Sequence, residues 1–290
     1  MRTIAHLSDL HFGRIDHAVH RALADTVRSV APDIVIVSGD MTQRARHAEF
    51  VEARRFLEAL PSPQILVPGN HDVPLYNLWL RTSRPLGRYK HHISANLEPF
   101  YADAEIAVAG VNTARALTFK NGRINEEQLA RVASRFADQA EDVTRIVVTH
   151  HPFEGASATD SEGIVGRARM AMAAFSRSRV DMILSGHLHR NHFGGSAARY
   201  VISGYSALLI QAGTAMSERR REEANSFNVI RIERPHISLE CKAWDPGGGF
   251  VTASTRTFRF DSSGWLPEEP AVMPTFVAAA PDGAIKSQAI

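Results

Sequence analysis

The sequence contains little cysteine, no long apolar run and no marked excess of either charge. Cys241 is the only cysteine among 290 residues, which excludes an internal disulfide framework and any cysteine-rich metal site. No segment approaches the ~18 uncharged apolar residues of a membrane-spanning helix, and the N-terminus lacks the apolar stretch of a signal peptide. We therefore expect a protein of the reducing cytoplasm that has no membrane span.

The charge balance indicates no particular macromolecular partner. The formal net charge is +2, with 22% charged and 44% hydrophobic residues, which is ordinary for a soluble globular protein. A charge this small gives no reason to expect a nucleic-acid polymer or a membrane surface as partner. The sequence leaves homo-oligomerisation open.

The pattern of apolar residues predicts an α/β (α+β) fold. In the first two thirds, short β-branched runs alternate with amphipathic segments that predict helices at residues 16–30, 43–60, 125–140 and 167–178. The strands predicted in this part are residues 3–7, 33–37, 64–67, 105–111, 145–148 and 181–184. Past Arg199, five strand-like runs predict a second sheet packed on the first: residues 199–203, 207–213, 226–233, 236–244 and 250–260.

Residues 1–265 are expected to form a single domain, because no linker-like stretch divides them. Residues 266–290, rich in Ala and Pro, are typical of a loosely held tail. Segment 73–101 mixes aromatic and basic residues, and it is either a cap that binds substrate or a connecting helix with a solvated basic face. Segment 153–168 is rich in Gly and Ser and is expected to form a mobile wall of a pocket.

The chain is rich in histidine, with 14 in all, and several follow predicted strands. Five of these strands are followed by Asp, Asn or His, at residues 8–11, 38–40, 68–72, 149–152 and 185–189. The carboxyl ends of strands in an open α/β sheet line one crevice, where ligands bind. Turn propensity explains an isolated Gly-Asp or Gly-Asn pair, but histidine is not a favoured turn residue. The pattern therefore predicts a polar site at one edge of the sheet, whereas His6, inside the first strand, is expected to be a core histidine.

Asp, His and Asn side chains without Cys form a ligand set that suits Mn, Fe, Zn or Co. Asp9 and His11 lie two residues apart, so within a strand they would point the same way, and His187 and His189 repeat this spacing. The set has seven members: Asp9, His11, Asp40, Asn70, His150, His187 and His189. Seven ligands are too many for one ion and suffice for two ions that share a carboxylate.

The charge of such a site indicates its substrate. Two divalent ions bring four positive charges, of which two carboxylates and one bridging hydroxide remove three. The residual charge of about +1 attracts an anion, and the shared hydroxide remains a nucleophile near neutral pH. A small phosphodiester, singly negative and cleaved by in-line attack, fits this field.

The ordered motifs resemble those of the calcineurin-like metallophosphoesterases: Asp9-x-His11, Gly39-Asp40, Gly69-Asn70-His71-Asp72, His150 and Gly186-His187-x-His189. The strings HLSDLHFG, VSGDMT and VTHHPF are most similar to the bacterial branch that contains class III cyclic-nucleotide phosphodiesterases. The resemblance implies a four-layer α-β-β-α sandwich of two mixed sheets flanked by helices. It also implies the ligand sets: Asp9, His11, Asp40 and His189 for one ion, and Asp40, Asn70, His150 and His187 for the other, with Asp40 bridging.

The turn VPGNHDVP, residues 67–74, carries three polar side chains that turn propensity alone explains only in part. In a site of this kind, Asn70 would contact both metal and substrate. His71 would project toward the phosphate, to protonate the leaving oxygen or to stabilise charge. Asp72 would accept a hydrogen bond from the other ring nitrogen of His71. Of the doublet at 150 and 151, the resemblance makes His150 the ligand and places His151 behind it.

We therefore expect a metal-dependent phosphoric diester hydrolase, with a cyclic nucleotide favoured as substrate by the resemblance. The rivals within this class are a glycerophosphodiester or phospholipid hydrolase and a UDP-sugar-lipid pyrophosphate hydrolase. A non-catalytic binding module stabilised by metal is the alternative from another class. Such a module is expected to have lost some ligands, whereas this chain retains them all.

Overall fold

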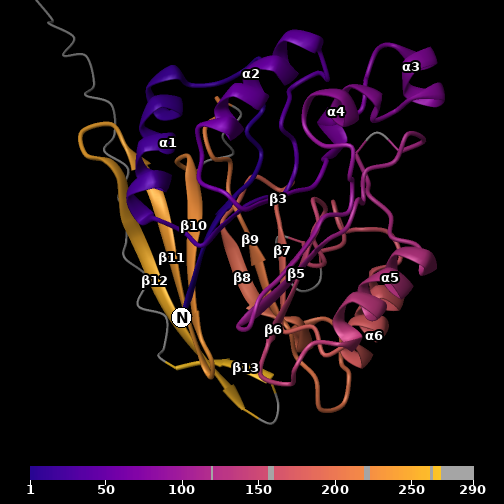
Figure 1. Cartoon of the computed structure of the whole chain (residues 1–290), viewed down its shortest axis with the longest axis vertical. Helices are drawn as coiled ribbons and strands as arrows, with labels where there is room; N and C mark the ends of the chain where they lie inside the picture. Colours follow the sequence, from indigo (N-terminus) through magenta and orange to yellow (C-terminus); the bar gives the residue numbers. More distant parts are fainter. Residues whose placement is uncertain (119, 156–159, 219–222, 262–263, 269–290) are drawn as a thin grey trace, which may run out of the picture.

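The protein has four layers, with two sheets face to face and helices on both outer sides (Figure 1). The computed structural model describes residues 1–118, 120–155, 160–218, 223–261 and 264–268. No helix in these ranges is long and apolar enough to cross a membrane. The α-β-β-α sandwich of two mixed sheets predicted from the sequence is confirmed.

The first sheet has seven strands in the order β13-β12-β11-β10-β1-β2-β3. Strands β1, β2 and β3 are parallel, and the other neighbours are antiparallel. The bounds are β1 Arg2–Leu7, β2 Ile34–Val37, β3 Gln64–Leu66, β10 Ser226–Glu233, β11 His236–Asp245, β12 Gly249–Asp261 and β13 Gly264–Pro267.

The second sheet has six strands in the order β4-β5-β6-β7-β9-β8. Strands β5, β6, β7 and β9 run parallel, and antiparallel strands flank them at both edges. The bounds are β4 Phe100–Ala102, β5 Ile106–Gly110, β6 Thr144–Val148, β7 Met182–Ser185, β8 His192–Gly195 and β9 Leu208–Gln211.

Amphipathic helices cover the outer faces: α1 (His17–Val30) and α2 (His47–Glu58) on the first sheet, α5 (Glu126–Ala137) and α6 (Ala168–Arg177) on the second. Helix α1 shows the local cause. Its buried residues Val19, Leu23 and Val27 recur every four positions, which places them on one face. The Asp16 carboxylate caps its first turn by accepting hydrogen bonds from the Ala18 and Val19 amides.

The core between the sheets explains why the early strands read as continuous apolar runs. In β1, Ile4 packs between the two sheets, whereas Ala5 and Leu7 pack against the helical layer. A strand buried on both faces needs apolar residues at successive positions. His6 is fully buried in this strand, with Nε2 3.0 Å from Ser38 Oγ, so the prediction of a core histidine is confirmed.

The sequence reading of the later strands needs correction. Residues 199–203 are not a strand, because only an isolated bridge joins Ile202 to Tyr205 and Val201 is exposed. The edge strand is β8 instead, whose HFGG sequence lacks β-branched residues. Strand β13 includes two residues expected in the tail, and the rest of that tail from 269 onward lies outside the described residues. The single domain over residues 1–265 stays a prediction.

Segment 73–101 is divided between two short helices and the start of β4. Helix α3 spans Leu78–Ser83 and helix α4 spans Gly87–His92. Figure 1 shows both near the edge of the molecule, beyond the end of α2. The segment is therefore not one continuous connecting helix, and its role as a cap that binds substrate stays a prediction.

Candidate metal centre

The carboxyl ends of parallel strands from both sheets meet at one place. Strands β1, β2 and β3 of the first sheet and β6 and β7 of the second are each followed at once by candidate ligands. The structure brings together all seven predicted side chains: Asp9, His11, Asp40, Asn70, His150, His187 and His189. Their grouping follows from the distances among them.

The first cluster joins the loops after β1 and β7. Asp9 Oδ1 lies 3.5 Å from His11 Nε2 and 3.2 Å from His189 Nε2. The two imidazole nitrogens are themselves 3.2 Å apart, and Asp40 Oδ2 lies 3.7 Å from His11 Nε2. Nitrogen and oxygen lone pairs therefore converge from three sides on one point.

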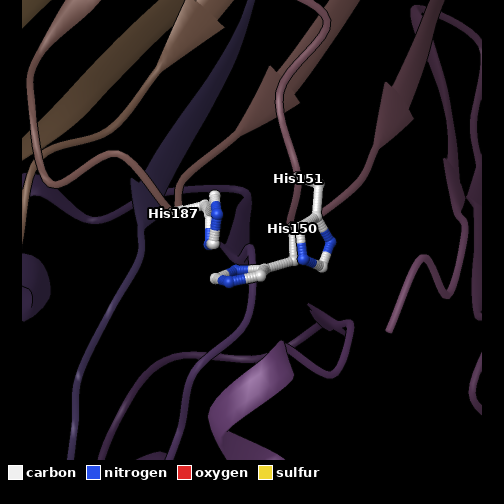
Figure 2. Close-up of side chains that lie close together, drawn as sticks. All are labelled: His150, His151 and His187. Atoms are coloured by element: carbon white, nitrogen blue, oxygen red, sulfur yellow. The ribbon is translucent and has the colours of Figure 1, made fainter. Parts of the chain in front are cut away.

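The second cluster joins the loops after β2, β3 and β6. His150 Nε2 lies 3.4 Å from Asp40 Oδ1 and 3.1 Å from Asn70 Oδ1. The His187 ring lies 5.1 Å from the His150 ring, and Figure 2 shows these two with His151 at the ends of β6 and β7. The Asp40 carboxylate thus directs Oδ2 to the first cluster and Oδ1 to the second.

Hydrogen bonds distinguish the two neighbouring histidines. His150 Nδ1 is 2.8 Å from the Ser38 carbonyl oxygen, so this nitrogen carries a proton and Nε2 is the nitrogen that faces the cluster. In His151, Nε2 is 2.9 Å from the Lys120 carbonyl oxygen, and Nδ1 accepts from Thr113 Oγ1 at 2.8 Å. Both His151 nitrogens are engaged, which favours His150 as the ligand although both rings lie near His187.

The chemistry of the donor atoms fits two cations. Asp9 Oδ1 and Asp40 Oδ2 are buried and accept no hydrogen bond within the described residues. A buried carboxylate oxygen without a donor costs free energy unless a positive charge lies beside it. The carboxylate–imidazole–amide set is one that divalent Mn, Fe and Zn accept. The site is thus built for metal, although each residue's role as a ligand stays a prediction.

The electrostatics of the cluster also favour cation binding. Burial alone would raise the pKa of both carboxyl groups, but the neighbouring histidines hold the pKa of Asp9 and of Asp40 well below the ordinary range. For His150, burial would lower the pKa, yet the Asp40 charge raises it to about 9. Burial and His150 together lower the pKa of His187 to about 3. Both carboxylates are therefore ionised, and a cation competes with the proton on His150.

The backbone at this site is strained. Five of the seven candidate ligands have a left-handed backbone, with φ between 50° and 74°: Asp9, His11, Asp40, His187 and His189. Such conformations are uncommon outside glycine and cost about 1–3 kcal/mol each. Backbone hydrogen bonds hold two of them, from Asp9 N to Gly39 O and from His11 N to Asp40 O. The sequence prediction that strand periodicity aligns these pairs is wrong, since the residues follow the strands, and His187 and His189 serve different clusters.

Two glycines allow the loops to approach each other. A Cβ at Gly69 would overlap the backbone nitrogen and Oδ1 of Asp40, and one at Gly186 would lie 2.5 Å from Asp9 Oδ2 and overlap Ser8 Oγ. The His187 amide, next to Gly186, donates to Asp9 Oδ2 at 3.0 Å. Each glycine therefore precedes a candidate ligand because a side chain there would displace another.

Comparison with known proteins agrees with this geometry. Residues 2–191 match the calcineurin-like phosphoesterase family, a span that is well over half of the chain and includes every candidate ligand. The chain belongs to this family. As a calcineurin-like phosphoesterase, it is a metal-dependent phosphoester hydrolase.

Individual relatives are more distant. A probable cyclic nucleotide phosphodiesterase of Synechococcus is 24% identical over 246 residues, which span 80% of this chain and 88% of the relative. A glycerophosphodiester phosphodiesterase of Enterobacter lignolyticus is 29% identical over 160 residues, or 51% of this chain and 56% of the relative. A purple acid phosphatase from yellow lupin seeds superposes with a TM-score of 0.67 at 10% identity, covering 88% of this chain and 53% of that one. The last similarity shows the fold alone.

One predicted contact of this calcineurin-like site is wrong. Asp72 does not pair with His71: its carboxylate accepts hydrogen bonds from the amides of Met41, Thr42 and Gly69 and from Thr42 Oγ1. Burial, together with the Asp40 charge, raises the pKa of Asp72 to about 7 despite these donors. Asp72 instead ties the loop after β2 to the loop after β3.

His71 is oriented by the backbone. Its Nδ1 lies 2.9 Å from the Gln43 carbonyl oxygen, and its amide donates to Asp40 Oδ1 at 2.8 Å. The ring meets the His11 ring edge-on at 4.9 Å. A carbonyl accepts the Nδ1 proton in both the neutral and the cationic ring, so Nε2 is the nitrogen that can exchange a proton.

A cleft of about 270 Å³ opens over the centre. Besides Asp40, Asn70, His71, His187 and His189, its lining includes side chains that sequence reasoning missed, among them Lys120 and Arg190. No motif marks Lys120, whereas Arg190 directly follows His189 and its position was a usable signal.

Asp160, Glu162 and Gly163 also line the cleft, in agreement with the predicted wall, but residues 156–159 of that wall lie outside the described part. A larger groove of about 820 Å³ between α5 and α6 contains none of the candidate ligands.

Proposed function

We propose that the protein is a dinuclear metal-dependent phosphodiesterase, with a cyclic nucleotide as the favoured substrate. The observation that carries this proposal is the Asp40 carboxylate, which faces one cluster with each oxygen. A shared carboxylate is what two ions held side by side require. Two bound cations would supply a Lewis acid for the phosphoryl oxygens and lower the pKa of an attacking water.

The residues around the cations have separate tasks. Asn70 contributes a neutral oxygen beside His150, so it binds without cancelling the positive charge that attracts a phosphodiester. His71 offers Nε2 as the proton donor to the leaving oxygen, while the Gln43 carbonyl fixes its ring. Lys120 and Arg190 add positive charge to the cleft and favour an anionic substrate.

A glycerophosphodiester is the second candidate substrate, because the more identical of the two curated relatives above bears that activity in its name. The cyclic nucleotide is preferred because the probable cyclic nucleotide phosphodiesterase aligns with 80% of this chain rather than 51%. Lipid-linked pyrophosphates remain a third class to be tested.

The test is turnover by purified, metal-loaded protein, first with Mn²⁺ on bis-p-nitrophenyl phosphate. Cyclic nucleotides, glycerophosphodiesters and UDP-linked lipids are then compared by kcat/KM. Metal-dependent hydrolysis of the diester supports the proposal, and the highest kcat/KM identifies the substrate class. Folded protein that contains metal yet shows no turnover would contradict it. A variant that removes a carboxylate far from the ligands serves as the control. Asp25→Ala removes an exposed carboxylate on α1 and should have the kcat/KM of the wild type.

The remaining assignments rest on composition. We propose Mn, Fe or Zn as the cations, because the ligands are oxygens and imidazoles. We also propose the cytoplasm as the compartment, because the single cysteine does not call for an oxidising one. Residues 1–265 are proposed to act as one domain. Metal analysis of protein purified without added metal tests the first of these proposals.

A further inference from the structure

Several large apolar side chains around α3 are exposed to solvent. Tyr76, Leu78 and Trp79 are 75%, 65% and 70% exposed, and Leu117 is 87% exposed. They make up half of the eight large hydrophobic side chains that are exposed in the described part of the chain. We call these four residues the α3 tip. An apolar group of this kind on a soluble protein marks a contact surface more often than a random gathering does.

The α3 tip is held in place by a buried arginine. Arg81 is 3% exposed, and its guanidinium donates to the carbonyl oxygens of Pro74, Ala116 and Thr118 at 2.7–3.0 Å. The last two carbonyls flank Leu117, so Arg81 fastens that residue's loop to α3. The backbone on both sides of Leu117 is therefore anchored to α3.

The surroundings of the α3 tip are strongly basic. Residues 73–97 and 113–125 contain no Asp or Glu, and they contain seven Lys and Arg: Arg81, Arg84, Arg88, Lys90, Arg115, Lys120 and Arg123. Arg84, Lys90 and Lys120 are exposed. Arg44 lies over the Tyr76 ring at 5.2 Å and adds another cation. The net charge of +2 for the whole chain conceals this local excess.

We propose that the α3 tip docks on the surface of an anionic phospholipid membrane. Tryptophan, tyrosine and leucine beside exposed lysine and arginine are the combination that enters the headgroup region of such membranes. A protein partner is less well matched, since a stable interface covers ~800 Å² on each side and the α3 tip has four side chains. His71 and Lys120, both in the cleft lining, lie a few residues from Tyr76 and Leu117 in sequence.

The first test is co-sedimentation of the metal-loaded protein with vesicles, at low and high salt. Vesicles of phosphatidylcholine with phosphatidylglycerol should bind the protein, and binding should weaken as salt screens the charges. The double variant Leu78→Ser with Trp79→Ser should lose about tenfold or more in vesicle affinity. The matched control is Val201→Ser, which removes an apolar side chain 93% exposed elsewhere and should bind like the wild type. Matching circular dichroism spectra and metal content of all three proteins show that each is folded.

Fluorescence provides the second test, because only one of the three tryptophans lies in the α3 tip. Emission should shift to shorter wavelength on binding, and Trp79→Phe should bind yet lose that shift. The proposal is overturned if the wild-type protein does not bind anionic vesicles, or if the double variant binds them as well as the wild type does. Equal binding to pure phosphatidylcholine at every salt concentration also overturns it. So does a dimer that the double substitution converts to monomer, because the α3 tip is then a subunit contact.

Discussion

The carboxylates at the amino ends of the parallel strands differ in their hydrogen bonding from the carboxylates at the carboxyl ends. At the amino ends, Asp33 accepts the Thr3 amide, and Asp181 accepts the Arg145 amide and Trp265 Nε1. At the carboxyl ends, Asp9 Oδ1 and Asp40 Oδ2 are buried and accept no hydrogen bond from the described residues. Asp33 and Asp181 are hydrogen-bonded within the protein, and so is Asp72 after β3, whereas Asp9 and Asp40 each keep one oxygen for a ligand.

This difference shows how one sheet serves both stability and chemistry. A buried carboxylate with donors, such as Asp181, stabilises the fold, whereas the oxygens of Asp9 and Asp40 that accept no hydrogen bond face only imidazoles, and a bound cation would lower the free-energy cost of burying them. Strained backbone conformations follow the same division, since within the described ranges five of the nine non-glycine residues with positive φ are candidate ligands. A substitution at the carboxyl ends should therefore reduce metal binding and activity, whereas one at the amino ends should reduce stability.

The largest effect is expected from Asp40→Ala, compared with Asp181→Asn at the other end. Asp40→Ala should lose metal and reduce kcat/KM far beyond the ~10–100-fold that loss of a residue supporting a ligand causes. Asp181→Asn should keep kcat/KM per folded molecule and lower the free energy of unfolding by about 1–3 kcal/mol. Metal analysis, kinetics and urea unfolding measure these quantities. If Asp40→Ala retains metal and turnover, the two ends do not differ as described.

Gly186→Ala should come next, because its new Cβ would press on Ser8 Oγ and Asp9 Oδ2. We expect weaker metal binding and a loss of activity by about 10²-fold or more, as for other displaced ligands. The control is Gly247→Ala, where the nearest atom is 3.6 Å away and no loss is expected. Metal titration followed by kinetics measures both variants. Normal metal affinity in Gly186→Ala would show that the loops after β1 and β7 have room to separate.

His71→Asn separates proton transfer from metal binding within the carboxyl-end site. The variant should keep its metal and lose ~10²–10⁴-fold in kcat on diesters with alkyl leaving groups. The loss should be smaller with p-nitrophenyl esters, since p-nitrophenolate leaves without a proton. Parallel kinetics on the two substrate types provide the readout. Equal losses on both would assign His71 to charge stabilisation instead.

The smallest effect concerns His6, a histidine inside β1 rather than after it. Burial lowers the pKa of His6 to about 3, although Asp9 opposes the shift, so the folded protein holds this ring neutral. The ring binds a proton below pH ~6.5 in the unfolded chain but not in the folded protein. As the pH is lowered from 6.5 toward 3, the free energy of unfolding should therefore decrease by about 1.4 kcal/mol per pH unit. Replacing His6 by Gln should remove that part of the slope in urea unfolding between pH 7.5 and 4.5. The wild-type protein measured in parallel is the reference, and an identical slope in the His6 variant would contradict the assignment.

Sequence patterns located the site well because it depends on order along the chain. Each polar cluster follows an apolar run, and parallel strands carry such clusters to one edge. The backbone of the site was not predictable, because Asp and His adopt the left-handed region more often than most residues but still in a minority of cases, and nothing in their order signals it. The partners of Asp72 were missed for a similar reason: three of its four donors are the backbone amides of Met41, Thr42 and Gly69, which any sequence supplies. Strand β8 was missed because its HFGG sequence resembles a loop.

The left-handed backbone at Asp9, His11, Asp40, His187 and His189 limits how this centre can be moved to another protein. If only the seven side chains were copied onto regular strands, they would point in other directions, because the local backbone conformation sets the direction of each side chain. The portable unit is the set of five loops after β1, β2, β3, β6 and β7, with the glycines that let them approach and the amide contacts between them. Grafts that carry those loops intact should bind cations, whereas grafts of side chains alone should not.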